Sequence, residues 1–166
     1  MILITGSDSG FMTLPEIVYE PLLFWESEVF WVNILVIDGQ GGGLGKQLVT
    51  AMKAAYPEVE ITAVGTNSMA TSVMLKAGAD NAATGENAVV VGCRKADVIV
   101  GPIGMVIADA LLGEITPRMA AAVGQSNAKR IMIPISHCNN LIAGIPDQPV
   151  SRLVQSAVEQ LKKIIN

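Results

Sequence analysis

The chain has 166 residues, a net charge of -4 at pH 7 and 51% hydrophobic residues. A chain of this length is expected to form one domain, with enough apolar side chains for a sizeable core. The negative charge excludes a nucleic-acid-binding protein that relies on a basic face. No apolar run approaches the roughly 20 residues of a membrane-spanning helix.

The first 31 residues differ from the rest of the chain. They carry five acidic residues and no Lys or Arg, a charge of -5, whereas residues 32–166 carry 11 basic and 10 acidic residues, a charge of +1. They also hold six of the seven aromatic residues. The segment lacks the basic start of a secretory signal. It is therefore either an arm that packs on the domain or on a partner chain, or upstream sequence included by a misplaced start.

We favour the misplaced start, because Val32 lies immediately before the first expected strand and a valine codon can serve as a bacterial start. Finding peptides from residues 1–31 in the native protein by mass spectrometry would contradict it. The domain is then expected to span residues 32–166. The two cysteines, Cys93 and Cys138, lie far apart without C-x-x-C spacing. This spacing and the missing signal indicate a reduced, cytoplasmic protein in which both are small buried hydrophobes.

A glycine-rich loop follows the first strand. Residues 33–37 form an apolar run that predicts a strand covered on both faces, and Asp38 ends it. Residues 39–45 then contain five glycines, and apolar residues at helical spacing predict a helix from Gly43 to Tyr56 that stops at Pro57. Glycines let a ligand approach the main chain, and unpaired N–H groups at a helix N-terminus favour an anion.

Known phosphate-binding patterns match this loop only in part. The dinucleotide pattern G-x-G-x-x-G fits at Gly39 and Gly41 but has Leu44 in the sixth position. The spacing of Gly39, Gly43 and Gly45 is similar to the loop of short-chain dehydrogenases, whose Tyr-x-x-x-Lys pair is absent. A Walker A loop would require Ser or Thr after Lys46, where the chain has Gln47.

Several motifs together resemble a bacterial family described only as a domain of unknown function. They are ILVIDGQGGGLGKQL, GTNSMATSVMLKAGAD, ATGENAVVV, ADVIVGPIG and LLGEITPRMA. The resemblance covers residue 33 to about residue 158. It implies a compact, Rossmann-like α/β domain and carries no activity, substrate or catalytic residue.

The elements after the loop alternate between strands and helices. Strands are expected over 59–64, 79–83, 97–100 and 129–135, and helices from Asn67 or Ser68 to Lys76, from about 84 to 94, over 105–112, from Thr116 to about 123, and after Pro149. Residues 136–140 are expected to link the strand at 129–135 to an antiparallel strand at 141–145. The pattern predicts a doubly wound α/β domain with about five strands, a mostly parallel sheet and an antiparallel edge.

In an open parallel sheet, ligands bind beyond the carboxyl ends of the strands. Three loops are expected at that edge and define the predicted site: Gly39, Gly41, Gly42, Gly43, Gly45 and Lys46; Thr66, Asn67 and Ser68; Gly101 and Gly104. The second strand ends without the acidic residue of an ordinary NAD site or the Arg of an NADP site. Asn67 or Ser68 is also expected to cap a helix, and Thr84 to Asn87 either to start one or to face a ligand.

No catalytic group can be assigned from these residues. Asp38, Asp109 and Glu114 are candidate acids, bases or magnesium ligands, and His137 beside Cys138 is a candidate only if the two side chains meet. A single histidine and no Cys/His cluster predict no zinc site.

The sequence therefore predicts binding of a nucleotide, a dinucleotide or another phosphorylated small molecule. Two alternatives stay open: a small oxidoreductase or transferase acting as a homo-oligomer, because about 135 residues leave little room for a substrate domain, and a non-enzymatic sensor or assembly subunit.

Overall fold

The computed structural model describes residues 32–135 and 142–165. The expectations for residues 1–31, for the His137–Cys138 pair and for the hairpin link at 136–140 lie outside these ranges. The elements, in chain order, are β1 (Asn33–Asp38), α1 (Gly43–Ala55), β2 (Glu60–Gly65), α2 (Ser68–Lys76), β3 (Asn81–Thr84), α3 (Glu86–Lys95), β4 (Val98–Pro102), the 3-10 helix η1 (Ile103–Val106), α4 (Pro117–Gln125), β5 (Lys129–Ile133) and α5 (Val150–Ile165).

The five strands form one sheet in the order β3-β2-β1-β4-β5. Every pairing within the described ranges is parallel, and β1 lies in the centre with Ile34 opposite Ile61 of β2 and Val98 of β4. The predicted antiparallel edge is wrong: β5 pairs parallel with β4, and residues 142–145 contain no strand. Residues 142–149 instead connect the sheet to α5, because a short apolar run can form either a strand or a connection.

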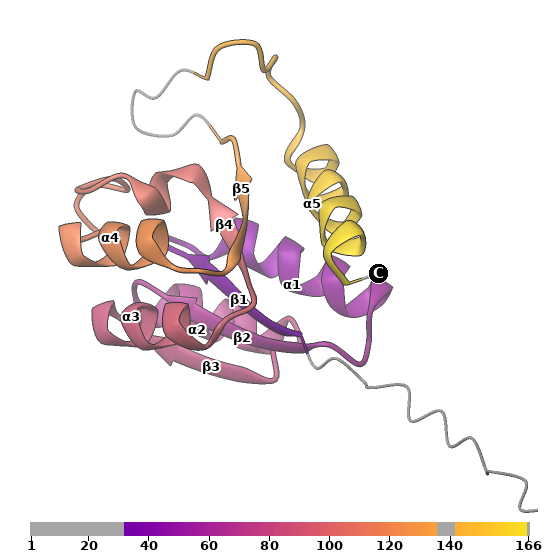
Figure 1. The fold of residues 1–166 in the computed structure, drawn as a ribbon, viewed down its shortest axis with the longest axis horizontal. Coiled ribbons are helices and arrows are strands. Elements are labelled where there is room, and N and C mark those ends of the chain that lie inside the picture. Colours follow the sequence, from indigo (N-terminus) through magenta and orange to yellow (C-terminus); the bar gives the residue numbers. More distant parts are fainter. Residues whose placement is uncertain (1–31, 136–141, 166) are drawn as a thin grey trace, which may run out of the picture.

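Helices cover both faces of the sheet, as the continuous apolar strands require. Alternate side chains of β1 enter the two cores: Ile34 and Val36 pack with residues of α1, α2 and α5, and Leu35 and Ile37 pack with residues of α3 and α4. Figure 1 shows α1 and α5 on one side of the sheet and α3 and α4 on the other. This doubly wound arrangement confirms the α/β class and is Rossmann-like in its strand order.

Side-chain caps fix the starts of two helices, α2 and α4. The side chain of Asn67 accepts a hydrogen bond from the Ala70 N–H (2.9 Å) at the start of α2, as predicted. The Thr116 hydroxyl accepts one from the Met119 N–H (3.1 Å), with proline at the first position of α4. Helix α3 starts differently, because its N-cap is Gly85, with a φ of 91°, and the Thr84 hydroxyl instead bonds that of Thr71 (2.7 Å).

The predicted helix over residues 105–112 is wrong. A single 3-10 turn spans Ile103–Val106, and left-handed residues follow it. Apolar composition there reflects burial of Met105 and Leu111 rather than a helical face. Within the described ranges, the helices are too short or too polar to cross a bilayer.

Candidate functional site

The glycine-rich loop lies at the carboxyl edge of the sheet, between β1 and the start of α1. The strand order changes direction at β1, because β2 and β3 are added on one side of it, and β4 and β5 on the other. Such a switch point separates the loops that follow the two neighbouring strands and leaves a crevice between them.

Three of the five loop glycines are explained by contacts within the protein. Gly42 has a φ of 68°, and a Cβ there would lie 2.7 Å from the Ala70 Cα of α2. Cβ atoms on Gly39 and Gly45 would collide with the side chains of Glu114 and Met74, respectively. Glycine at these positions lets α1 and α2 pack closely and holds the turn in shape.

The other two glycines, Gly41 and Gly43, face open space. Both are exposed, and a Cβ at either position would meet nothing within 4 Å. Neither N–H group donates a hydrogen bond to any described residue. Packing within residues 32–135 and 142–165 therefore gives no reason for glycine at these two positions.

A buried carboxylate fixes the shape of the loop. Asp38, only 6% exposed, accepts hydrogen bonds from the Gly39 N–H (2.8 Å) and the Gly45 N–H (2.6 Å). One side chain thus joins both ends of the loop and satisfies a donor in the first turn of α1. The sequence suggested Asp38 only as an acid, base or magnesium ligand, and the structure places it in a capping role.

Burial raises the pKa of the Asp38 carboxyl, because desolvation disfavours its charged form. The N–H groups of Gly45, Gly39 and Leu44 oppose this effect, and the nearby charge of Glu114 adds to it. The net upward shift means that these backbone donors do not fully offset the loss of water around the carboxylate.

A second carboxylate reaches the loop from the segment between β4 and α4. Glu114 accepts hydrogen bonds from the Gln40 N–H (2.7 Å), the Thr66 hydroxyl and, through its Oε2 atom, the Asn67 side-chain amide (3.3 Å). It therefore connects the loop after β1 to the loop after β2. Desolvation raises the pKa of Glu114, but these three donors outweigh it and the net shift is downward.

The backbone before Glu114 is left-handed at several positions. Asp109, Leu111 and Leu112 have φ values of 63°, 55° and 60°, and Gly113 has 86°. Each non-glycine residue in this conformation costs roughly 1–2 kcal/mol. Leu112 is also 92% exposed, so its own burial does not offset that cost. The segment bends sharply enough to bring Leu111 and Glu114 over the glycine loop.

A cavity of about 190 Å³ lies beside the loop. Its walls are residues 38–44, together with Pro102, Leu111 and Ile135. It is smaller than the roughly 300 Å³ at the lower end for sites that bury a drug-sized ligand. The enclosed part can hold a group such as a phosphate, and a larger ligand would extend past the rim.

The structure brings together only part of the predicted site. Thr66 and Asn67 lie against the glycine loop, and the Asn67 amide donates to the Gln40 carbonyl (3.0 Å). Lys46 and Ser68 are exposed at the starts of α1 and α2. Gly101 is enclosed between Ile37 and Met105, where a Cβ would collide, so packing explains this glycine. Gly104 is buried within η1, and a Cβ there would make only ordinary contacts, the nearest at 3.6 Å.

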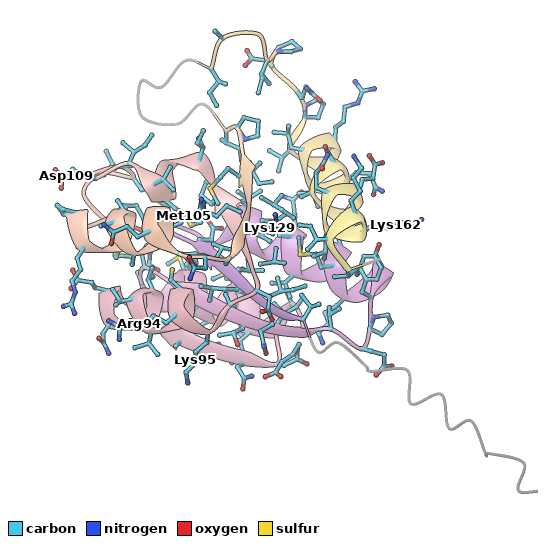
Figure 2. The ribbon with its side chains drawn as sticks, viewed as in Figure 1. Arg94, Lys95, Met105, Asp109, Lys129 and Lys162 are labelled. Atoms are coloured by element: carbon cyan, nitrogen blue, oxygen red, sulfur yellow. The ribbon has the colours of Figure 1, made fainter. Side chains whose placement is uncertain are left out.

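The catalytic candidates do not form an acid–base pair in the described ranges. Asp109 is exposed at the outer edge of its segment (Figure 2), whereas Asp38 and Glu114 are engaged with backbone and side-chain donors. No group of three His, Cys, Asp or Glu residues that could hold a metal occurs in these parts of the chain. Cys93 is buried, as predicted, and burial raises the pKa of its thiol to about 11.

Residues 33–166 match the family described as "Domain of unknown function (DUF3842)", and the chain belongs to this family. The resemblance inferred from the motifs is thereby confirmed. No curated protein matches the chain.

Two solved structures are similar in part. Apo saccharopine dehydrogenase (L-Glu forming) from Saccharomyces cerevisiae is 15% identical with a TM-score of 0.42, over 73% of this chain and 23% of the dehydrogenase. The dodecameric FMN-dependent UbiX-like decarboxylase from Escherichia coli O157:H7 is 20% identical with a TM-score of 0.39, over 80% of this chain and 75% of the decarboxylase. This chain thus spans less than a quarter of the dehydrogenase.

Substitution of two adjacent loop glycines tests which of them is required for packing. Gly42→Ala is expected to lower the free energy of unfolding by about 2 kcal/mol or more, because a left-handed residue would press its Cβ against the α2 backbone. Gly43→Ala has open space and is expected to change it by less than about 1 kcal/mol, in the stabilising direction. Urea unfolding measures both; equal midpoints for the two variants would contradict the packing role of Gly42.

The Glu114 contact is expected to make stability depend on pH. A lowered pKa in the folded state gives stability that is present above the ordinary glutamate value of about 4.3 and is lost as pH falls through the lowered pKa. Wild type should therefore be more stable than Glu114→Gln at pH 7, and the gap should shrink below about pH 4. Exposed Glu58→Gln serves as control. A gap that stays constant from pH 7 to pH 3 would exclude a charge contribution from Glu114.

Proposed function

We propose that the loop at residues 39–45 binds a nucleotide or another phosphorylated small molecule. The observation that carries the proposal is the pair of exposed glycines, Gly41 and Gly43. Their N–H groups donate no hydrogen bond to the described residues, and a Cβ at either position would meet nothing within 4 Å. Two amide donors on an open glycine backbone suit a phosphate oxygen, which accepts hydrogen bonds and tolerates close approach only where Cβ is absent.

The position of these donors supports an anionic ligand. Gly43 begins the 13-residue helix α1, whose N-terminus carries a partial positive charge. Lys46 lies in the first turn and is exposed, so its ammonium group can approach a bound phosphate. Asp38 takes the donors of Gly39 and Gly45, which limits the phosphate to the outer side of the loop, where Gly41 and Gly43 lie.

The surroundings differ on the two sides of that phosphate position. Towards β4 and β5 the cavity wall is apolar, with Pro102, Leu111 and Ile135. On the side of β2, the polar side chains of Thr66 and Asn67 contact Glu114 and the glycine loop. A molecule with a phosphate in its middle and a sugar on one side fits this polarity better than inorganic phosphate alone, because the sugar hydroxyls would meet hydrogen-bonding groups.

Native mass spectrometry of the gently purified protein, followed by release and identification of small molecules, tests the proposal. Wild type is expected to carry a phosphorylated ligand or to gain thermal stability with ADP or pyrophosphate. Gly43→Val should lose both properties, because a branched side chain would occupy the space in front of the backbone donors.

Gly124→Val is the matched control. Gly124 is also an exposed helical glycine at which a Cβ would meet nothing within 4 Å, but it lies in α4, away from the loop. This variant should bind as wild type does. A wild-type protein that is empty and shows no response to ADP, pyrophosphate or sugar phosphates would refute the proposal.

A further inference from the structure

The Glu114 carboxylate is anchored through one of its two oxygens. Its Oε2 atom accepts from the Gln40 N–H and the Thr66 hydroxyl, and from the Asn67 amide at 3.3 Å. Its Oε1 atom has one long contact within the described ranges, 3.5 Å to the same amide. An ionised carboxylate has about four acceptor sites over its two oxygens. Glu114 is half-buried, so Oε1 keeps acceptor capacity in a side chain whose orientation is already fixed.

This acceptor lies where β1 and β2 end. Thr66 directly follows the last residue of β2, and its N–H donates to the Asp38 carbonyl of β1 (3.0 Å). In dinucleotide-binding domains a carboxylate at the end of the second strand accepts hydrogen bonds from ribose hydroxyls. Here the second strand supplies no acid, and the segment before α4 brings a carboxylate to the same place from a different part of the chain.

We infer that Glu114 selects a ligand with an unphosphorylated ribose, accepting hydrogen bonds from the ribose hydroxyls through Oε1. The inference rests on the proposed function, because it assumes a nucleotide whose phosphate lies at Gly41 and Gly43. The left-handed residues within 109–113 turn the chain so that Glu114 reaches the end of β2. In this way they supply a carboxylate that the sequence of β2 itself lacks.

Charge makes the same acceptor reject a phosphorylated ribose. A 2′-phosphate would add up to two negative charges beside a carboxylate, and repulsion between like charges at short range is strong in a partly desolvated site. The described neighbours of Glu114 in this cluster, Gln40, Thr66 and Asn67, are neutral and give no cation to compensate. The expected ligand is therefore of the ADP-ribose type without a 2′-phosphate.

Calorimetric titration with ADP-ribose and with 2′-phospho-ADP-ribose tests the inference. Wild type should bind ADP-ribose at least about tenfold more tightly, since a hydrogen bond to a charged acceptor is lost and a repulsion is gained with the 2′-phosphate. Glu114→Gln should weaken ADP-ribose binding about tenfold and bring the ratio of the two affinities towards one. Glu58→Gln, an exposed carboxylate outside the site, should keep the wild-type ratio.

A wild-type comparison keeps the test valid if Glu114→Gln does not fold. ADP should bind more tightly than its 2′-deoxy and 3′-deoxy analogues, because each analogue lacks a hydroxyl that the Glu114 carboxylate would accept from. Equal affinities for ADP and both deoxy analogues would overturn the role of Glu114.

The outcomes separate this inference from the proposed function. If pyrophosphate binds and is lost on Gly43→Val, but ADP-ribose and its 2′-phosphate bind equally, the loop binds phosphate and Glu114 does not select ribose. If Glu114→Gln tightens binding of every anion, Glu114 competes with the ligand and the inference is wrong. If wild type binds none of these probes, the proposed function fails and the inference fails with it.

Discussion

The geometry of the candidate site depends on one buried carboxylate. Asp38 accepts from the N–H groups of Gly39 and Gly45, at opposite ends of the glycine loop, and so closes the loop onto the first turn of α1. Burial of this carboxylate has a desolvation cost that raises its pKa, and hydrogen bonds from the backbone offset part of that cost. The tight packing of Gly42 on α2 and the outward position of Gly41 and Gly43 both require the loop to keep this shape.

The loop therefore has fewer N–H groups left for an anion than its glycine content suggests. Asp38 and Glu114 already use the amides of Gly39, Gln40 and Gly45. Any ligand must be recognised by the remaining donors and must tolerate two carboxylates nearby. This constraint favours a molecule that presents an anion at one point and hydroxyl groups at another, over one that is uniformly charged.

Local signals in the sequence predicted most of the fold. The apolar run at 33–37, the caps at Asn67 and Thr116 and the glycine loop each depend on residues that are close in the chain. The segment 103–113 was not predictable, because left-handed leucines follow no propensity. The Glu114 contact joins residues 74 positions apart, and no spacing rule indicates such a pair. The absence of a strand at residues 142–145 was likewise not predictable, because a short apolar run occurs in strands and in connections alike.

The pairing of the first and last helices has a consequence for how the chain folds. Leu48 and Met52 of α1 are completely buried in the same core as Leu161 of α5. Helix α5 packs on α1 but comes last in the sequence of the domain. A nascent chain that emerges from the ribosome N-terminus first exposes this apolar face of α1 until almost all of the domain has been made. Strand pairings that each require a helical crossover add to the delay, since distant contacts form slowly. A chain with α1 in place and α5 undocked would expose apolar surface that the native fold buries between these two helices.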